Sequence, residues 1–78
     1  MMDINKKTLA VVGLGYVGLP LAVEAALKGY TVTGIDVSPK LLDQIDKRHS
    51  PFANDDRFAK DFARVTKKPS PLSVIFLA

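Results

Sequence analysis

Three glycines near the amino end constrain the fold of this chain more than any other feature. Gly13, Gly15 and Gly18 have the spacing G-x-G-x-x-G, and they directly follow an apolar run at residues 8–12. Such a run is typical of a strand that is buried on both faces of a parallel sheet. Glycine has no Cβ, so it allows a tight turn from a strand into a helix. The pattern predicts a strand, a glycine turn and a helix.

The residues after this turn predict a helix and a second strand. Residues 16–28 favour a helix, which Gly29 would end in a left-handed cap. Because this helix is apolar nearly all round, we expect it to be covered on more than one side. Residues 30–36 are rich in β-branched side chains and predict the second strand.

The rest of the chain continues the alternation of helices and strands. A second helix is predicted to begin at Ser38 and Pro39, since serine is favoured as the N-cap residue and proline at the first helical position. Residues 54–64 predict a further short helix, with Phe58 and Phe62 in the core. Residues 72–78 predict another buried strand. The alternation indicates an α/β fold, a Rossmann-type parallel sheet with flanking helices.

Length indicates that this sheet is incomplete. The chain has 78 residues, whereas a three-layer nucleotide-binding fold needs roughly 100 to 200. Three strands are about half of a six-stranded doubly wound sheet. We therefore expect residues 1–78 to be the amino-terminal part of a Rossmann domain.

The glycine turn predicts a site for a dinucleotide pyrophosphate. Free N–H groups and the positive dipole end at the start of a helix attract anions. Gly13 would make the turn, Gly15 would allow close approach of the phosphates, and Gly18 would let the helix pack against the strand. The residues between them would contribute mainly backbone contacts: Leu14, Tyr16 and Val17.

An acid at the end of the second predicted strand indicates which dinucleotide is bound. Asp36 follows the last glycine by 18 residues, near the spacing of about 20 expected for a ribose-binding carboxylate. Its charge would repel a 2′-phosphate, and no arginine follows it directly. The sequence therefore favours NAD over NADP as cofactor.

Composition argues against several other functions. The net charge of +3 is spread along the chain, without a dense basic stripe, so we expect no nucleic-acid partner. No apolar run is long enough to span a membrane, and the amino end lacks the pattern of a signal peptide, so we expect a cytoplasmic protein.

The sequence offers no candidate catalytic residue or metal site. It has no cysteine, and a single histidine, His49, cannot form a zinc site alone. Asp55, Asp56 and Asp61 are interpreted as the solvated start and face of a helix.

The segment Gly-Leu-Gly-Tyr-Val-Gly-Leu-Pro-Leu-Ala at residues 13–22 resembles the UDP-glucose/GDP-mannose dehydrogenase family, in particular its UDP-N-acetylsugar 6-dehydrogenases. The resemblance covers most of residues 8–49. It implies an NAD-dependent oxidoreductase that converts the C6 alcohol of a nucleotide sugar to a carboxylate, for polysaccharide precursor synthesis. It also implies NAD contacts at Val17, Asp36 and the glycines, and at Lys40, one position before the usual basic residue of many members.

The resemblance also implies what residues 1–78 would lack. The family uses a catalytic cysteine, a central helix and a sugar-nucleotide domain, all further along the chain. A chain without cysteine has no thiolate nucleophile, so we expect it to be inactive alone and to meet a UDP-sugar only as part of the full-length protein.

Two alternatives remain open from the sequence. One is the NAD-binding segment of another, hydroxyacid-type dehydrogenase. The other is a truncated, non-catalytic remnant. Half a sheet leaves an open edge, so for such a remnant we expect self-association or poor solubility. For the protein as a whole, we expect a homo-oligomer.

Overall fold

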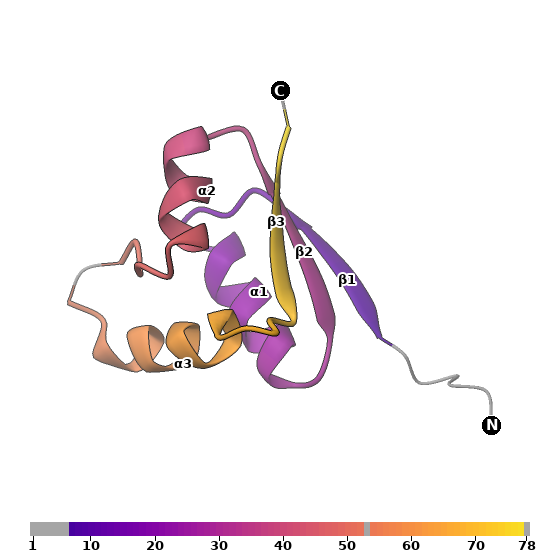
Figure 1. Cartoon of the computed structure of the whole chain (residues 1–78), viewed down its shortest axis with the longest axis vertical. Coiled ribbons are helices and arrows are strands. Elements are labelled where there is room, and N and C mark those ends of the chain that lie inside the picture. Colours follow the sequence, from indigo (N-terminus) through magenta and orange to yellow (C-terminus); the bar gives the residue numbers. More distant parts are fainter. Residues whose placement is uncertain (1–6, 53, 78) are drawn as a thin grey trace.

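The described residues form three parallel strands and three helices, in the order β-α-β-α-α-β (Figure 1). The computed structural model describes residues 7–52 and 54–77. The elements are β1 (Thr8–Val12), α1 (Gly18–Leu27), β2 (Thr31–Asp36), α2 (Pro39–Asp46), α3 (Asp56–Thr66) and β3 (Leu72–Phe76). The predicted α/β fold with a parallel sheet is confirmed.

The sheet has the order β1-β2-β3, with β2 in the middle. Val11 of β1 lies opposite Gly34 of β2, and Gly34 lies opposite Val74 of β3. Since all three strands run in the same direction, their carboxyl ends meet at one edge of the sheet. At this edge the glycine turn follows β1, and Asp36 is the last residue of β2.

The helix boundaries differ slightly from the prediction. α1 begins at Gly18 rather than at residue 16, because the preceding residues form the turn out of β1. α3 begins at Asp56, since the Asp55 side chain caps it by accepting a hydrogen bond of 2.9 Å from the Phe58 N–H. For α2 the predicted start is confirmed: Ser38 Oγ accepts from the Leu41 N–H at 3.2 Å.

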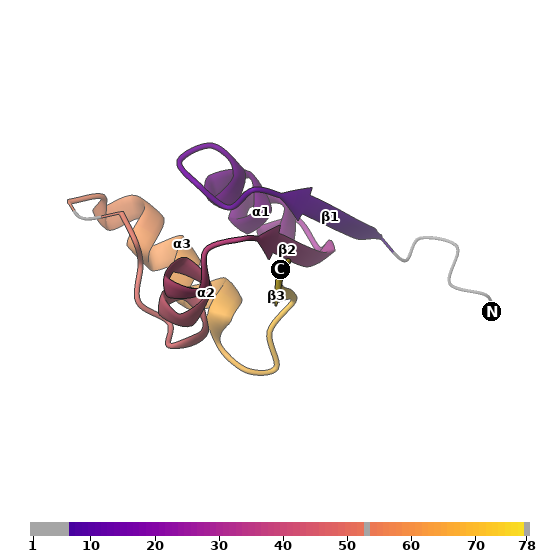
Figure 2. The same cartoon turned by 90° about the horizontal axis from the view of Figure 1, so that it is seen from above.

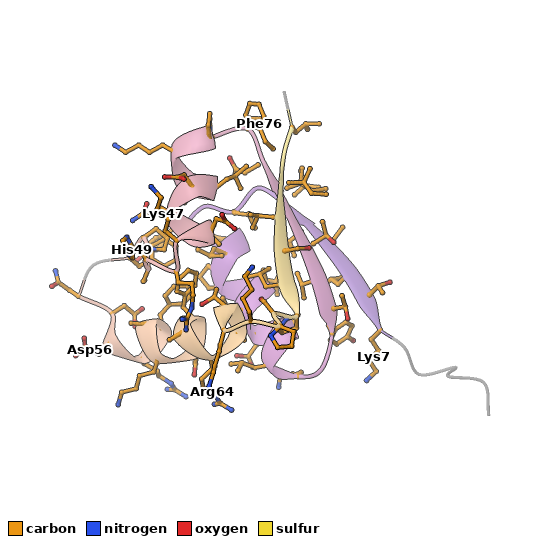
Figure 3. All side chains as sticks on the ribbon, in the orientation of Figure 1. Lys7, Lys47, His49, Asp56, Arg64 and Phe76 are labelled. Carbon is orange, nitrogen blue, oxygen red and sulfur yellow. The ribbon has the colours of Figure 1, made fainter. Side chains whose placement is uncertain are left out.

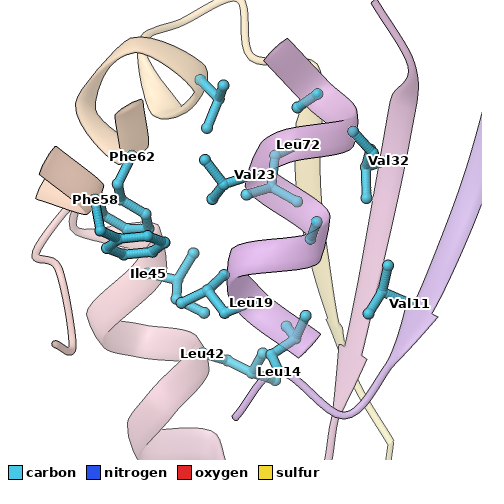
Figure 4. Close-up of a cluster of buried hydrophobic side chains, with 14 residues drawn as sticks. Val11, Leu14, Leu19, Val23, Val32, Leu42, Ile45, Phe58, Phe62 and Leu72 are labelled. Carbon is cyan, nitrogen blue, oxygen red and sulfur yellow. The ribbon is translucent and has the colours of Figure 1, made fainter. Parts of the chain in front are cut away.

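The core lies between the sheet and the helices. Figure 4 shows apolar side chains from α1, α2 and α3 meeting those of the strands. The largest fully buried side chains are Phe62, Leu14, Leu19 and Val32. The predicted core positions Phe58 and Phe62 are buried, and their rings lie 5.6 Å apart. Packing against this core, rather than helix propensity, fixes α3.

Truncation of the core aromatic should destabilise the fold strongly. Phe62 is 1% exposed, so Phe62→Ala leaves a cavity and is expected to cost about 3–5 kcal/mol. Urea unfolding monitored by circular dichroism measures this change. Lys60→Ala, at an exposed position of the same helix, should stay within about 0.5 kcal/mol. Equal unfolding midpoints for the two variants would contradict the packing of α3.

Among the described residues, the helices cover one face of the sheet. α1, α2 and α3 lie on the same side of the strands (Figure 2), as expected when successive crossovers have the same hand. On the other face Val12 is 75% exposed and Ile75 is 52% exposed. The expectation that the first strand is buried on both faces is therefore wrong for the described residues.

α1 is covered on more than one side, as expected. It packs against the sheet and also against α3, and its buried residues include Leu19, Ala22 and Val23. Leu21, however, remains 56% exposed.

Within residues 7–52 and 54–77, no helix has the length and apolar character needed to cross a membrane.

Candidate dinucleotide-binding site

The glycine turn connects the carboxyl end of β1 to the amino end of α1. Gly13 has φ +89°, a conformation that L side chains rarely adopt. Its N–H donates to the Ile35 carbonyl at 2.7 Å, which extends the pairing of β1 with β2 into the turn. A Cβ on Gly18 would lie 1.7 Å from the Gly13 carbonyl oxygen. Both positions therefore need glycine for the turn itself.

Gly15 differs from the other two glycines of the turn. A Cβ at this position would meet no atom of the described chain within 4 Å, and its φ is outside the left-handed region. The packing of the protein therefore does not require glycine here. The open space beside its Cα suits a group that must approach the backbone closely, as a pyrophosphate does.

The amino end of α1 has free hydrogen-bond donors. Val17 is the N-cap residue, and its side chain makes no cap hydrogen bond. Among the hydrogen bonds of the described residues, none is donated by the N–H of Gly15, Tyr16 or Val17. Such donors, together with the positive end of the helix dipole, make this terminus suitable for an anion.

Leu14 has a structural role that the sequence did not reveal. Its side chain is fully buried, and a Cβ on Gly34 of β2 would lie 2.7 Å from its methyl carbons. The side chain thus fills the space that the missing side chain of Gly34 leaves. It anchors the glycine turn over the middle strand, whereas the sequence predicted mainly backbone contacts at this position.

Asp36 lies next to the turn and is held by backbone N–H groups. Its Oδ2 accepts a hydrogen bond of 2.7 Å from the Leu14 N–H, and its Oδ1 accepts one of 2.9 Å from the Ser38 N–H. These bonds, that of Leu14 first, hold the pKa of the Asp36 carboxyl below its usual range, against a smaller opposing influence of burial. The carboxylate is therefore charged at neutral pH.

A shallow hollow lies beside Asp36 at the carboxyl edge of the sheet. Its volume is about 120 Å³, and it is lined by Val12, Gly13, Ile35, Asp36, Val37 and Leu77. Ligands of open parallel sheets bind outside the carboxyl ends of the strands. The hollow therefore lies at the edge of the sheet where such ligands bind.

Tyr16 and Val17 are the exposed large side chains of the turn, at 85% and 78% exposure. The Tyr16 ring packs edge-on against Phe52, with ring centroids 5.5 Å apart. The two rings line a larger hollow of about 490 Å³, together with Pro20, Pro51 and Asp55. Phe52 is partly buried against the core, and its contact with the turn was not predicted from the sequence.

The other residues considered from the sequence lie outside the glycine turn and do not line the hollow beside Asp36. Lys40 is exposed in the first turn of α2, and the described residues provide it with no hydrogen bond or ion pair. Figure 3 shows His49 beyond the end of α2 and Asp56 at the start of α3. Within the described part of the chain, no three His, Cys, Asp or Glu residues are grouped as a metal would require.

Most of the sequence matches a known protein family. Residues 7–67 match the model of the "UDP-glucose/GDP-mannose dehydrogenase family, NAD binding domain". The matched segment includes the glycine turn and Asp36, and it extends through α3. It therefore continues past residue 49, where the sequence resemblance fades.

Individual relatives agree with the family match. A curated NDP-N-acetyl-D-galactosaminuronic acid dehydrogenase of Ralstonia nicotianae is 30% identical over 84 residues, covering 99% of this chain and 20% of that protein. A UDP-N-acetyl-D-mannosamine dehydrogenase of Methanococcus maripaludis is 49% identical over 43 residues, covering 55% of this chain and 10% of the relative. The chain thus spans about a fifth or less of the length of these relatives.

Solved structures show the same fold. The UDP-N-acetyl-mannosamine dehydrogenase of Staphylococcus aureus superposes with a TM-score of 0.81 at 25% identity, covering 92% of this chain and 17% of that one. A UDP-glucose dehydrogenase of Pyrobaculum islandicum gives a TM-score of 0.79 at 27% identity, covering 96% of this chain and 17% of its own.

Proposed function

Because the chain belongs to the UDP-glucose/GDP-mannose dehydrogenase family, we propose that its glycine turn and Asp36 bind NAD for the oxidation of the C6 alcohol of a UDP-sugar to a uronate. The cofactor of the family domain is NAD. The observation that carries the proposed site is Gly15, whose missing side chain leaves space that no part of the described chain fills.

In this proposal each part of the site binds a different part of the cofactor. The N–H groups of Gly15, Tyr16 and Val17 donate to the pyrophosphate, while Gly13, Leu14 and Gly18 shape the turn. Asp36 accepts hydrogen bonds from the adenosine ribose. We also propose that Lys40, exposed at the start of α2, approaches the adenosine side of the cofactor.

The proposed reaction requires more than these residues. Oxidation of a primary alcohol to a carboxylate removes two hydrides, consumes one water, and converts two NAD⁺ to two NADH with release of three protons. This chain has no cysteine to act as a nucleophile between the two oxidations. We therefore propose that it is the amino-terminal part of the NAD-binding domain of a longer, homo-oligomeric enzyme, whose other domains bind the sugar and perform the chemistry.

Cofactor selectivity tests the proposed function. We expect isothermal titration to show binding of NAD and weaker binding of NADP, because the Asp36 carboxylate repels a 2′-phosphate. Asp36→Ala removes the hydrogen bonds to the ribose and should weaken NAD binding by about tenfold or more.

Asp43→Ala is the matched control for this titration. It removes a carboxylate from the exposed side of α2, where Asp43 pairs with Lys47 at 3.1 Å. The control should bind NAD as the unaltered chain does. Equal affinities for NAD and NADP, or an Asp36→Ala variant that binds NAD normally, would refute the proposed site.

A further inference from the structure

The Asp36 carboxylate is bound on both oxygens by parts of the chain that are distant from each other. Leu14, which donates to Oδ2, belongs to the glycine turn, 22 residues earlier. Ser38, which donates to Oδ1, is the cap residue of α2. One side chain therefore links the turn after β1 to the start of α2 at the carboxyl edge of the sheet.

The glycine turn is held at Leu14 from two sides. The Leu14 side chain is fully buried over Gly34, and its N–H is bound to Asp36. Hydrogen bonds that involve a charged group are stronger than those between neutral groups. Leu14 lies directly between Gly13, where the turn begins, and Gly15, where the open space lies. The position of the Leu14 peptide therefore sets the position of the free N–H groups that follow it.

From these contacts we infer that Asp36 is a positioning residue for the pyrophosphate, in addition to its ribose contact. This inference rests on the proposed function, since it assigns a second role within the same site. Asp36 keeps the glycine turn in the shape that binds phosphate. Removal of its charge then weakens binding even of a ligand that has no ribose.

The carboxylate has the capacity for both roles. Its two oxygens offer about four lone-pair directions, and the bonds from Leu14 and Ser38 use two of them. The others can accept hydrogen bonds from ribose hydroxyls. Asparagine has nearly the same shape but only one accepting oxygen, so Asp36→Asn cannot bind both N–H groups and places an N–H₂ group against one of them.

Inorganic pyrophosphate separates positioning from ribose binding. If Asp36 acted on pyrophosphate only through its charge, Asp36→Asn would bind this anion more tightly, because a nearby negative charge is gone. If Asp36 holds the turn, the same variant should bind pyrophosphate about fivefold or more weakly. Asp43→Asn, which removes the same charge at an exposed site, should bind it at least as tightly as the unaltered chain.

A second measurement needs no variant and no ligand. In the unaltered chain, the amide proton resonances of Leu14 and Ser38 should shift together as pH falls through the pKa of Asp36, and the Leu14 amide should exchange slowly above that pH. Amides that do not respond, or pyrophosphate binding that is unchanged or tighter in Asp36→Asn, would overturn the positioning role. Loss of the proposed function is recognised separately, as failure of the unaltered chain to bind NAD.

Discussion

Gly18→Ala is expected to prevent stable folding of this chain. The added Cβ would lie 1.7 Å from the carbonyl oxygen and 2.9 Å from the carbonyl carbon of Gly13. Both atoms are backbone, and the turn at Gly13 is fixed by its bond to Ile35, so no side-chain rotation relieves the overlap. We expect a loss of about 4 kcal/mol or more, a large part of the roughly 5–15 kcal/mol that stabilises a typical domain.

Thermal and urea unfolding, followed by circular dichroism, measure this loss. The expected result is an unfolded chain, or a midpoint far below that of the unaltered protein. Gly15→Ala is the matched control, because it adds the same methyl group three residues earlier in the same turn. A Gly18→Ala variant with an unchanged unfolding midpoint would contradict the close contact of Gly18 with the Gly13 carbonyl.

Gly15→Ala should leave the fold intact and abolish tight NAD binding. The new Cβ meets no atom of the described chain within 4 Å, and alanine in place of glycine restricts the unfolded chain. We therefore expect stability equal to that of the unaltered protein or higher by up to about 1 kcal/mol. The same methyl group would occupy the space in which the pyrophosphate approaches the backbone, so NAD affinity should fall by at least about tenfold.

Titration of NAD into folded Gly15→Ala checks this second result. Ala59→Gly on α3, a change of the opposite sense remote from the turn, serves as a control, since it should alter stability without altering NAD affinity in the folded protein. If Gly15→Ala bound NAD as tightly as the unaltered chain, the phosphates would not lie against this residue. The two alanine variants together separate the glycine that the fold requires from the glycine that the ligand requires.

Local patterns in the sequence were sufficient to predict the elements of this fold. The apolar run at residues 8–12, the β-branched run that ends at Asp36, and the cap formed by Ser38 each act within a few residues. Phe58 and Phe62 were predicted as core from their spacing on one helix face, and both are buried. Such features depend on backbone propensity and periodicity, which can be read directly from the sequence.

Contacts between distant segments were not predictable in the same way. The burial of Leu14 over Gly34 and its bond to Asp36 depend on the register between β1 and β2. The edge-on contact of Tyr16 with Phe52 depends on how the α2–α3 connection returns to the turn. The open face of the sheet follows from the placement of all three helices on one side. Each of these is a property of tertiary packing.

The position of β1 at the border of the described sheet has a consequence for the proposed binding of NAD. The hollow beside Asp36 lies on the side of β1 that faces β2, and neighbouring strands are about 4.8 Å apart. A dinucleotide that enters the hollow with its adenosine and crosses the glycine turn with its phosphates would extend its nicotinamide past the outer edge of β1. The residues described here would then determine which cofactor is bound and where it is anchored, while groups beyond β1 would set the face of the ring that accepts hydride and the rate of that transfer.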